Sequence, residues 1–231
     1  MNISSSEFDE KLTELRHLYP AGVEYVVQNL FGSHDSNRIA SHIVNRGIGN
    51  FRDWGEYFSK SQVSNSPHYQ VRKPTSQEVE LQKLFIVLQM TYVGAPMLYY
   101  GDEVGMWGAN DPDSRKPMIW ADIEYQDEVS NPDGSFRPAD TVKVNQQLKD
   151  YYQKLIAIRN NNIELQLGDY KTLLTEDDKA IFAYSRQYQH ETTWVVFNNS
   201  AEKQQIELPR STCLEMINLI SGQKFQCGST T

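Results

Sequence analysis

Two polar motifs follow apolar runs at places where strands are expected to end. The motif GSHD, residues 32–35, comes after the run 23–31, and the motif YYGDE, residues 99–103, closes the run 95–100. A single polar loop of this kind is weak evidence, because loops at strand ends are polar in every α/β protein. Two successive ones are stronger, because catalytic groups of a (β/α) barrel project from the C-terminal ends of its parallel strands.

The elements around these motifs predict an order of strand, helix, strand. Residues 23–31 are rich in β-branched and aromatic side chains, and residues 95–100 are almost wholly apolar, as is typical of buried parallel strands. Between them, Thr75-x-x-Glu78 resembles a capping box that begins a helix running to about residue 93. The predicted strands would therefore bring both motifs to the same end of a sheet.

The remaining patterns predict further helices and then a change of fold. Helical spacing predicts helices over 6–19 and 141–161, with a possible short helix over 36–45. The segment between that short helix and Thr75 is long for a structureless loop, so we expect local structure there and a role at a site. Alternating segments starting at Tyr170, Ala180, Thr193 and Gln204 indicate an antiparallel sheet or sandwich beyond a boundary near residue 165.

Charge and cysteine content exclude several classes. Acidic residues outnumber basic ones by 30 to 22, a net charge of −8, so attraction to a polyphosphate backbone is a poor basis for binding and nucleic acid is excluded as a partner. No stretch approaches the roughly 20 apolar residues of a membrane span, and the start carries no visible secretion signal. Cys213 and Cys227 form no C-x-x-C pattern, which disfavours a zinc ribbon or a redox motif. The two cysteines, which could be free thiols, do not identify the cellular compartment.

Two long motifs carry a family resemblance. NLFGSHDSNR (residues 29–38) and LQMTYVGAPMLYYGDEVGMWGANDPDSRKPMIW (residues 88–120) closely resemble the last third of the catalytic barrel in the α-amylase superfamily of glycoside hydrolases. Within that superfamily, the sequences of these motifs are most similar to those of neopullulanase, cyclomaltodextrinase and maltogenic amylase, including those of bacterial starch-utilisation systems. The resemblance implies an α/β plus all-β chain: residues 1–165 as the C-terminal portion of a (β/α)8 TIM barrel, its last two strands and helices, and 166–231 as a small, truncated antiparallel β-sandwich-like domain.

The resemblance also implies site residues. Asp35 matches the third catalytic carboxylate, which stabilises an oxocarbenium-like transition state, and His34 matches its substrate-binding neighbour. Asp111 and Arg115 match positions that hold a sugar further from the cleaved bond. Alternatively, His34 and Asp35 form only a local hydrogen bond, and Asp111 and Arg115 only a structural ion pair. No metal ligands are predicted.

Several neighbouring residues keep two interpretations. Arg38 orients the loop or pairs with Asp35 and is not expected to be catalytic. The acidic pair Asp102 and Glu103 suggests acid–base chemistry, but Gly-Asp clusters ordinarily shape turns, and the structural interpretation is favoured. The aromatic residues Tyr99, Tyr100 and Trp107 fit barrel packing as well as sugar stacking, whereas Trp54 and Tyr57 are better candidates for a stacking platform.

The resemblance further implies that essential parts are missing. The family's nucleophilic Asp lies in a Gly-x-Arg-x-Asp motif and its general-acid Glu in a second motif, and neither precedes Asn29. We therefore expect a fragment of a retaining glycosidase for α-glucans that is inactive alone. The alternatives are a non-catalytic carbohydrate-binding or barrel-complementing module, or an inactive amylase-like scaffold. The expected partners are α-glucan oligosaccharides, with self-association through exposed barrel edges. No cofactor is expected, although calcium is possible in the full-length parent enzyme. The sequence does not decide between a bacterial periplasmic and a cytoplasmic location.

Overall fold

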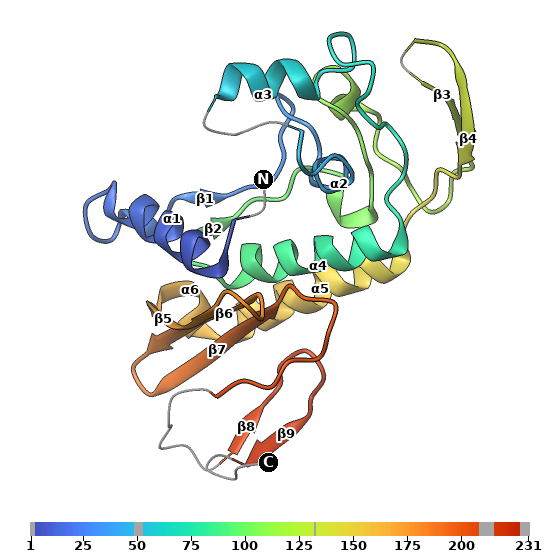
Figure 1. Ribbon diagram of the computed structural model, residues 1–231. Helices are drawn as coiled ribbons and strands as arrows, with labels where there is room; N and C mark the ends of the chain where they lie inside the picture. The colour runs from blue at the N-terminus through green and yellow to red at the C-terminus, as the bar shows by residue number, and fades with distance from the viewer. Residues whose placement is uncertain (1–2, 49–52, 132, 208–214, 227–231) are drawn as a thin grey trace. The chain divides into compact units, whose positions relative to one another are not determined.

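The computed structural model describes residues 3–48, 53–131, 133–207 and 215–226 (Figure 1). These residues divide into two compact units. One unit comprises residues 28–89 and 96–153, and the other comprises 3–27, 90–95 and the chain from 154 onward. Across the part of the chain that is described, no helix has the length and apolar character needed to cross a bilayer.

Six α-helices and nine strands are present among the described residues. The helices are α1 Ser5–His17, α2 Ile39–Val44, α3 Trp54–Ser61, α4 Ser76–Thr91, α5 Gln146–Asn161 and α6 Ile163–Leu167. The strands are β1 Gln28–Asn29, β2 Ala95–Pro96, β3 Glu128–Ser130, β4 Phe136–Asp140, β5 Asp169–Glu176, β6 Ile181–Tyr188, β7 Glu191–Asn198, β8 Glu215–Ile217 and β9 Lys224–Gln226. The four helices predicted from spacing are confirmed as α1, α2, α4 and α5.

Side-chain caps fix where these helices begin. At α4 the predicted capping box is reciprocal: the Glu78 amide donates to Thr75 Oγ1 at 3.3 Å, and the Thr75 amide donates to Glu78 Oε2 at 2.8 Å. Helix α5 begins later than the predicted residue 141, because the side chain of Asn145 accepts a hydrogen bond from the Leu148 amide and so starts the helix there.

The first two strands are much shorter than predicted. The run 23–31 contains a 3₁₀ turn over Val23–Tyr25, entered through Gly22 at φ 91°, and only β1 is a strand. In the run 95–100, Pro96 has no amide to donate, and Gly101 at φ 85° turns the chain. The prediction of full-length strands over 23–31 and 95–100 is therefore wrong.

What remains of the pairing between β1 and β2 is parallel (Figure 1). The Ala95 amide donates to the Val27 carbonyl at 2.8 Å, and the Met97 amide donates to the Asn29 carbonyl at 3.0 Å. Both partners advance by two residues between these bonds, which is the register of a parallel pair. The two segments that lead to the polar motifs thus run side by side in one direction.

The C-terminal part is β-rich, as predicted. Strands β5, β6 and β7 form an antiparallel sheet in that order, and β8 pairs with β9. Strand β6 is the buried centre of this sheet, with Tyr184 fully covered and Phe182 in edge-to-face contact with Phe8 of α1.

The predicted strand starting at Gln204 is wrong for residues 204–207, which lie in no ladder. Alternation alone does not supply a pairing partner. Cys213 and Cys227 lie outside the described residues.

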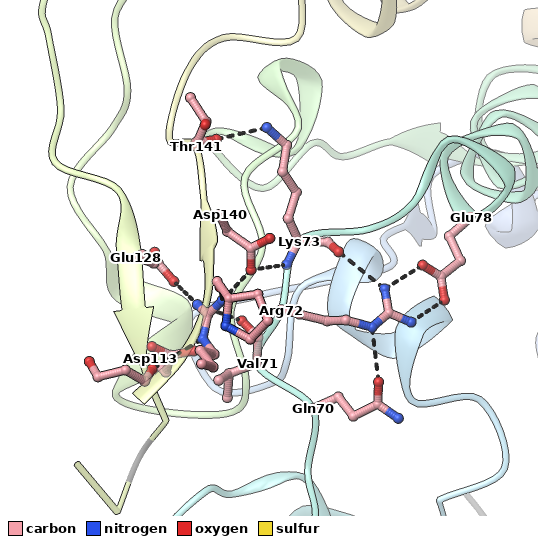
Figure 2. A network of polar contacts seen from close by, with 12 residues as sticks. Gln70, Val71, Arg72, Lys73, Glu78, Asp113, Glu128, Asp140 and Thr141 are labelled. Atoms are coloured by element: carbon pink, nitrogen blue, oxygen red, sulfur yellow. Dashed lines mark hydrogen bonds and ion pairs between the residues drawn. The ribbon is translucent and has the colours of Figure 1, made fainter. Parts of the chain in front are cut away.

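Strands β3 and β4 form a hairpin in the segment between β2 and α5. The Arg137 guanidinium on β4 bonds both Asp140 and Glu128, with 3.1 Å to Glu128. Figure 2 shows Lys73 with Asp140 and Thr141: the Lys73 amide donates to Asp140, and its ammonium donates to the Thr141 carbonyl. Ion pairs within the hairpin and hydrogen bonds from Lys73 therefore hold a hairpin that has little apolar periodicity in its sequence.

Candidate functional site

Four side chains predicted as site residues lie together in the first unit. Arg115 Nε lies 2.7 Å from Asp111 Oδ1, and Arg115 Nη2 lies 3.4 Å from Asp35 Oδ1. His34 Nε2 lies 3.1 Å from the other oxygen of Asp35. The side chains of His34 and Asp35 are 66% and 67% exposed, so both can reach a ligand from solvent. Arg115, on the loop after β2, thus contacts the motif after β1.

Short local bonds shape the loop that carries Asp35. The Ser33 amide donates to Ser36 Oγ, and the Asp35 amide donates to Ser33 Oγ, both at 3.1 Å. These Ser contacts use the loop's own side chains as turn formers. The His34 carbonyl accepts from Arg115 Nε at 3.0 Å and from Ser114 Oγ at 3.3 Å. The backbone of the motif is therefore fixed while its carboxylate stays exposed.

A second set of bonds shapes the loop that carries Asp111. A 3₁₀ turn over Asp113–Arg115 follows a cis peptide between Asp111 and Pro112. The Ala109 amide donates to Asp113 Oδ2 at 2.7 Å, and Gly108 packs so closely on this turn that an added Cβ would lie 2.6 Å from the Asp113 carbonyl oxygen. Arg115 is thereby presented on a compact turn, and an Arg fork held between two carboxylates suits recognition of sugar hydroxyls.

Arg38 pairs with Asp102 rather than Asp35. Its guanidinium is fully buried, and Nη1 donates to Asp102 Oδ1 at 2.9 Å and to the Tyr100 carbonyl at 2.6 Å. Burial raises the pKa of Asp102 to about 7, and the nearby Arg38 charge opposes that rise. The hypothesis of an Arg38–Asp35 pair is therefore wrong, whereas Arg38 does connect the two motifs. Asp102 is enclosed, which agrees with its structural interpretation.

The aromatic candidates separate by burial. Trp107 and Tyr57 are only 3% and 5% exposed, so neither offers an open face, and Tyr57 is wrong as a stacking platform. Tyr99 and Tyr100 flank the Arg38 guanidinium, whose carbon lies 4.4 and 4.8 Å from their ring centroids. Trp54 is 51% exposed. Of these candidates, Trp54 therefore presents the most open aromatic surface.

A separate cavity of about 260 Å³ is lined by none of the four predicted residues. Its walls come from Met106, Trp107, Lys116, Pro117, Ile119, Tyr125, Gln126, Glu128 and Val142. Lys116 and Glu128 already pair with each other at 2.8 Å, and the Tyr125 hydroxyl bonds the Trp120 amide. The walls of the cavity are therefore mostly apolar.

Sequence reasoning missed the helix that supports the site. Helix α3 begins at an Asp53 cap, where the side chain accepts from the Glu56 amide at 2.9 Å. Tyr57 on this helix donates to Asn37 Oδ1 at 3.0 Å, and Asn37 donates to the Tyr69 hydroxyl. The Asp-x-x-Glu spacing of Asp53 and Glu56 was the signal available in the sequence.

Comparisons with known proteins show what this chain is similar to. Residues 170–229 match the model of the Maltogenic Amylase, C-terminal domain. The chain is 29% identical over its whole length to a cyclomaltodextrinase from Geobacillus thermopakistaniensis, covering 31% of that protein. It is also 29% identical to Neopullulanase 2 from Thermoactinomyces vulgaris, over 96% of this chain and 30% of that one. This chain is related to the C-terminal part of α-amylase-type glycoside hydrolases.

A solved structure supports the same relationship. A cyclomaltodextrinase superposes with a TM-score of 0.57 at 26% identity, over 85% of this chain and 25% of that chain. The chain thus spans about a third or less of the α-amylase-type relatives it matches.

Proposed function

We propose that this chain supplies the sugar-binding part of a retaining glycoside hydrolase that acts on α-glucans such as starch, pullulan, cyclodextrin or maltooligosaccharides. Asp35 accepts hydrogen bonds from hydroxyls of the sugar at the cleaved bond, and these strengthen as oxocarbenium character develops. His34 donates to the same sugar, and Asp111 and Arg115 hold a sugar further along. The observation that carries this proposal is the position of Arg115 between Asp35 and Asp111.

Within this proposal, residues 1–165 are the end of a (β/α)8 barrel and residues 166–231 its trailing β domain. The parallel bonds between β1 and β2 support β1 and β2 as the last two barrel strands. The motifs after these strands then lie at the barrel face where active sites of this fold are found. The match of 170–229 to a maltogenic amylase C-terminal domain supports the second part.

The 231 residues by themselves are proposed to bind α-glucans without hydrolysing them. Retaining hydrolysis needs a carboxylate nucleophile and a carboxylic acid about 5 Å apart, on either side of the glycosidic bond. The motifs that carry those two groups in the family are absent from this sequence. Asp35 can stabilise charge but cannot replace both groups.

Calorimetric titration tests the proposal. Maltoheptaose should bind the purified chain, cellohexaose should not, and Asp35→Ala and Arg115→Ala should each weaken maltoheptaose binding about tenfold or more. The His68→Ala variant serves as a control for an ionisable residue outside the site. Equal binding of both sugars, or of wild type and Asp35→Ala, would contradict the assignment. Release of reducing sugar that depends on Asp35 would contradict the inactivity.

A non-catalytic carbohydrate-binding or barrel-complementing module is the second candidate. The exposure of His34 and Asp35 favours it, because a sugar can reach both without any other polypeptide. Adding a polypeptide that carries the nucleophile and acid segments distinguishes a barrel-complementing module from a carbohydrate-binding module. Recovered hydrolysis indicates complementation, whereas binding that never leads to hydrolysis indicates a binding module.

A further inference from the structure

Helix α3 is bonded to both loops that carry the proposed sugar-binding residues. Toward the first loop, Tyr57 donates to Asn37 Oδ1 at 3.0 Å, and Asn37 lies two residues after Asp35. Toward the second loop, Gln62 Nε2 donates to the Asp111 carbonyl at 3.2 Å. The helix is therefore attached at its middle to one loop and just past its end to the other.

A third set of bonds comes from Asn110, next to Asp111. The Asn110 amide donates to the Ser61 carbonyl at 3.0 Å, and its side chain donates to Ser61 Oγ at 3.2 Å and to the Phe58 carbonyl at 3.3 Å. Asn110 and Ser61 are both buried. Bonds this protected from water hold α3 and the second loop in a fixed relation.

Trp54 stands at the start of this helix with an open surface. Its ring lies 5.9 Å from the Tyr57 ring, centroid to centroid, at an interplanar angle of 29°, and the residue is 51% exposed. Tyr57 itself is buried, and His42 Nδ1 lies 2.6 Å from its hydroxyl. The stacked position of Trp54 is thus set by a side chain that is fixed on its other side.

The polar groups behind Trp54 carry no charge at neutral pH. Burial raises the pKa of Tyr57 to about 12 and lowers the pKa of His42. Both groups are therefore neutral there, and the contacts linking His42, Tyr57 and Asn37 persist without a change of charge. A rigid aromatic surface loses little conformational entropy when a ligand stacks on it.

We propose that Trp54 is a stacking platform for a glucosyl unit of an α-glucan, beyond the units held by Asp35, Asp111 and Arg115. The proposal rests on the proposed function. The flat apolar face of a pyranose packs on an indole ring, while the sugar hydroxyls at its edge stay in water. Tyr57 intervenes between Trp54 and the loop of Asp35, so Trp54 meets a different glucosyl unit of the α-glucan. Trp54 then favours long α-glucans over short ones.

Titration of the 231-residue chain with maltoheptaose and with maltotriose tests this. We expect Trp54→Ala to weaken maltoheptaose binding about tenfold and to change maltotriose binding by less than about twofold. Trp54→Phe should recover most of the lost affinity, because it keeps an aromatic face. If the role of Trp54 is structural, Trp54→Ala should instead weaken the binding of both sugars equally, and that result would overturn the proposal.

Trp120→Ala is the matched control. Trp120 is also in the first unit and is 56% exposed, but it lies outside α3 and outside residues 33–38 and 110–115. The Trp120→Ala variant should bind maltoheptaose like wild type, and a loss of affinity equal to that of Trp54→Ala would overturn the proposal.

Asp35→Ala separates the two proposals. If Asp35→Ala loses affinity and Trp54→Ala does not, the platform is wrong and the proposed function stands. If the wild-type chain binds no maltoheptaose, both are wrong.

Discussion

Arg115 Nη2 lies 3.4 Å from Asp35 Oδ1, although 80 residues separate the two in the sequence. The same guanidinium contacts Asp111 four positions earlier. An exposed ion pair adds little to stability, with typical values below about 1 kcal/mol. These exposed ion pairs therefore add little to the stability of the fold, and the role proposed for Arg115 is in sugar binding.

Arg115→Ala should separate binding from stability. We expect the free energy of unfolding to change by less than about 1 kcal/mol in urea, because the Arg115 side chain is 48% exposed. Maltoheptaose affinity should fall about tenfold in the same preparation. A variant that loses several kcal/mol of stability and retains its affinity would show that Arg115 is structural.

Arg38→Met should destabilise the first unit strongly. Removing the buried cation leaves Asp102 without its charge partner, and such losses cost about 3–5 kcal/mol. The double variant Arg38→Met/Asp102→Asn should lose less than the sum of the single variants, because no unpaired charge is left. Urea unfolding measures all three, and strictly additive losses would contradict the coupling.

The loss of stability caused by Arg38→Met should also depend on pH. Burial raises the pKa of Asp102 to about 7, so the contribution of its bound proton to stability is full below the ordinary value of 3.8 and is lost as pH rises through about 7. Asp102 is mostly protonated at pH 5 and mostly ionised at pH 8. Arg38→Met should therefore cost more at pH 8 than at pH 5, and an equal cost would show that Asp102 keeps one protonation state.

Glu78 should contribute stability that is lost in acid. Hydrogen bonds from Arg72 lower the pKa of Glu78 to about 2, against an ordinary 4.5, and Figure 2 shows the two bonds between them. A lowered pKa gives stability that is present above pH 4.5 and is lost as pH falls through about 2. Glu78→Gln should cost about 2 kcal/mol at pH 7, and the difference from wild type should shrink below pH 4.5. Urea unfolding across this range measures it, and a difference independent of pH would contradict the role of the charge.

Arg159→Met should destabilise the second unit. Arg159 donates to the carbonyls of Met90 at 2.8 Å and Gly94 at 2.6 Å, at and beyond the end of α4. Leaving these carbonyls without a donor should cost about 2–4 kcal/mol. Lys154→Met, at an exposed position of the same helix α5, should cost less than about 0.5 kcal/mol. Equal costs for the two variants would show that the carbonyl contacts do not matter.

Local signals in the sequence predicted the helices well and the strands less well. The capping box of Thr75 and Glu78 requires only neighbouring residues, and it is present as predicted. The lengths of β1 and β2 depend on the backbone partners available to each segment, which no property of Val26 or Met97 reveals. The strand expected from Gln204 failed for the same reason.

The proximity of the candidate residues was predictable where a motif carries them, and their role in sugar binding stays a prediction. His34, Asp35, Asp111 and Arg115 were named from the sequence, and the fold brings them together. The supporting contacts were not predictable. Tyr57 contacts Asn37 only because α3 returns to the first loop, and Arg38 has two acceptable acidic partners until burial selects Asp102.

The most direct test of the central claim is an amide NMR titration of the 231-residue chain with maltoheptaose. We expect saturable shifts in the amides of residues 33–38, 110, 111 and 113–115, and the loss of those shifts in Asp35→Ala. Shifts that avoid both loops, or that persist unchanged in Asp35→Ala, would contradict an α-glucan site at Asp35 and Arg115.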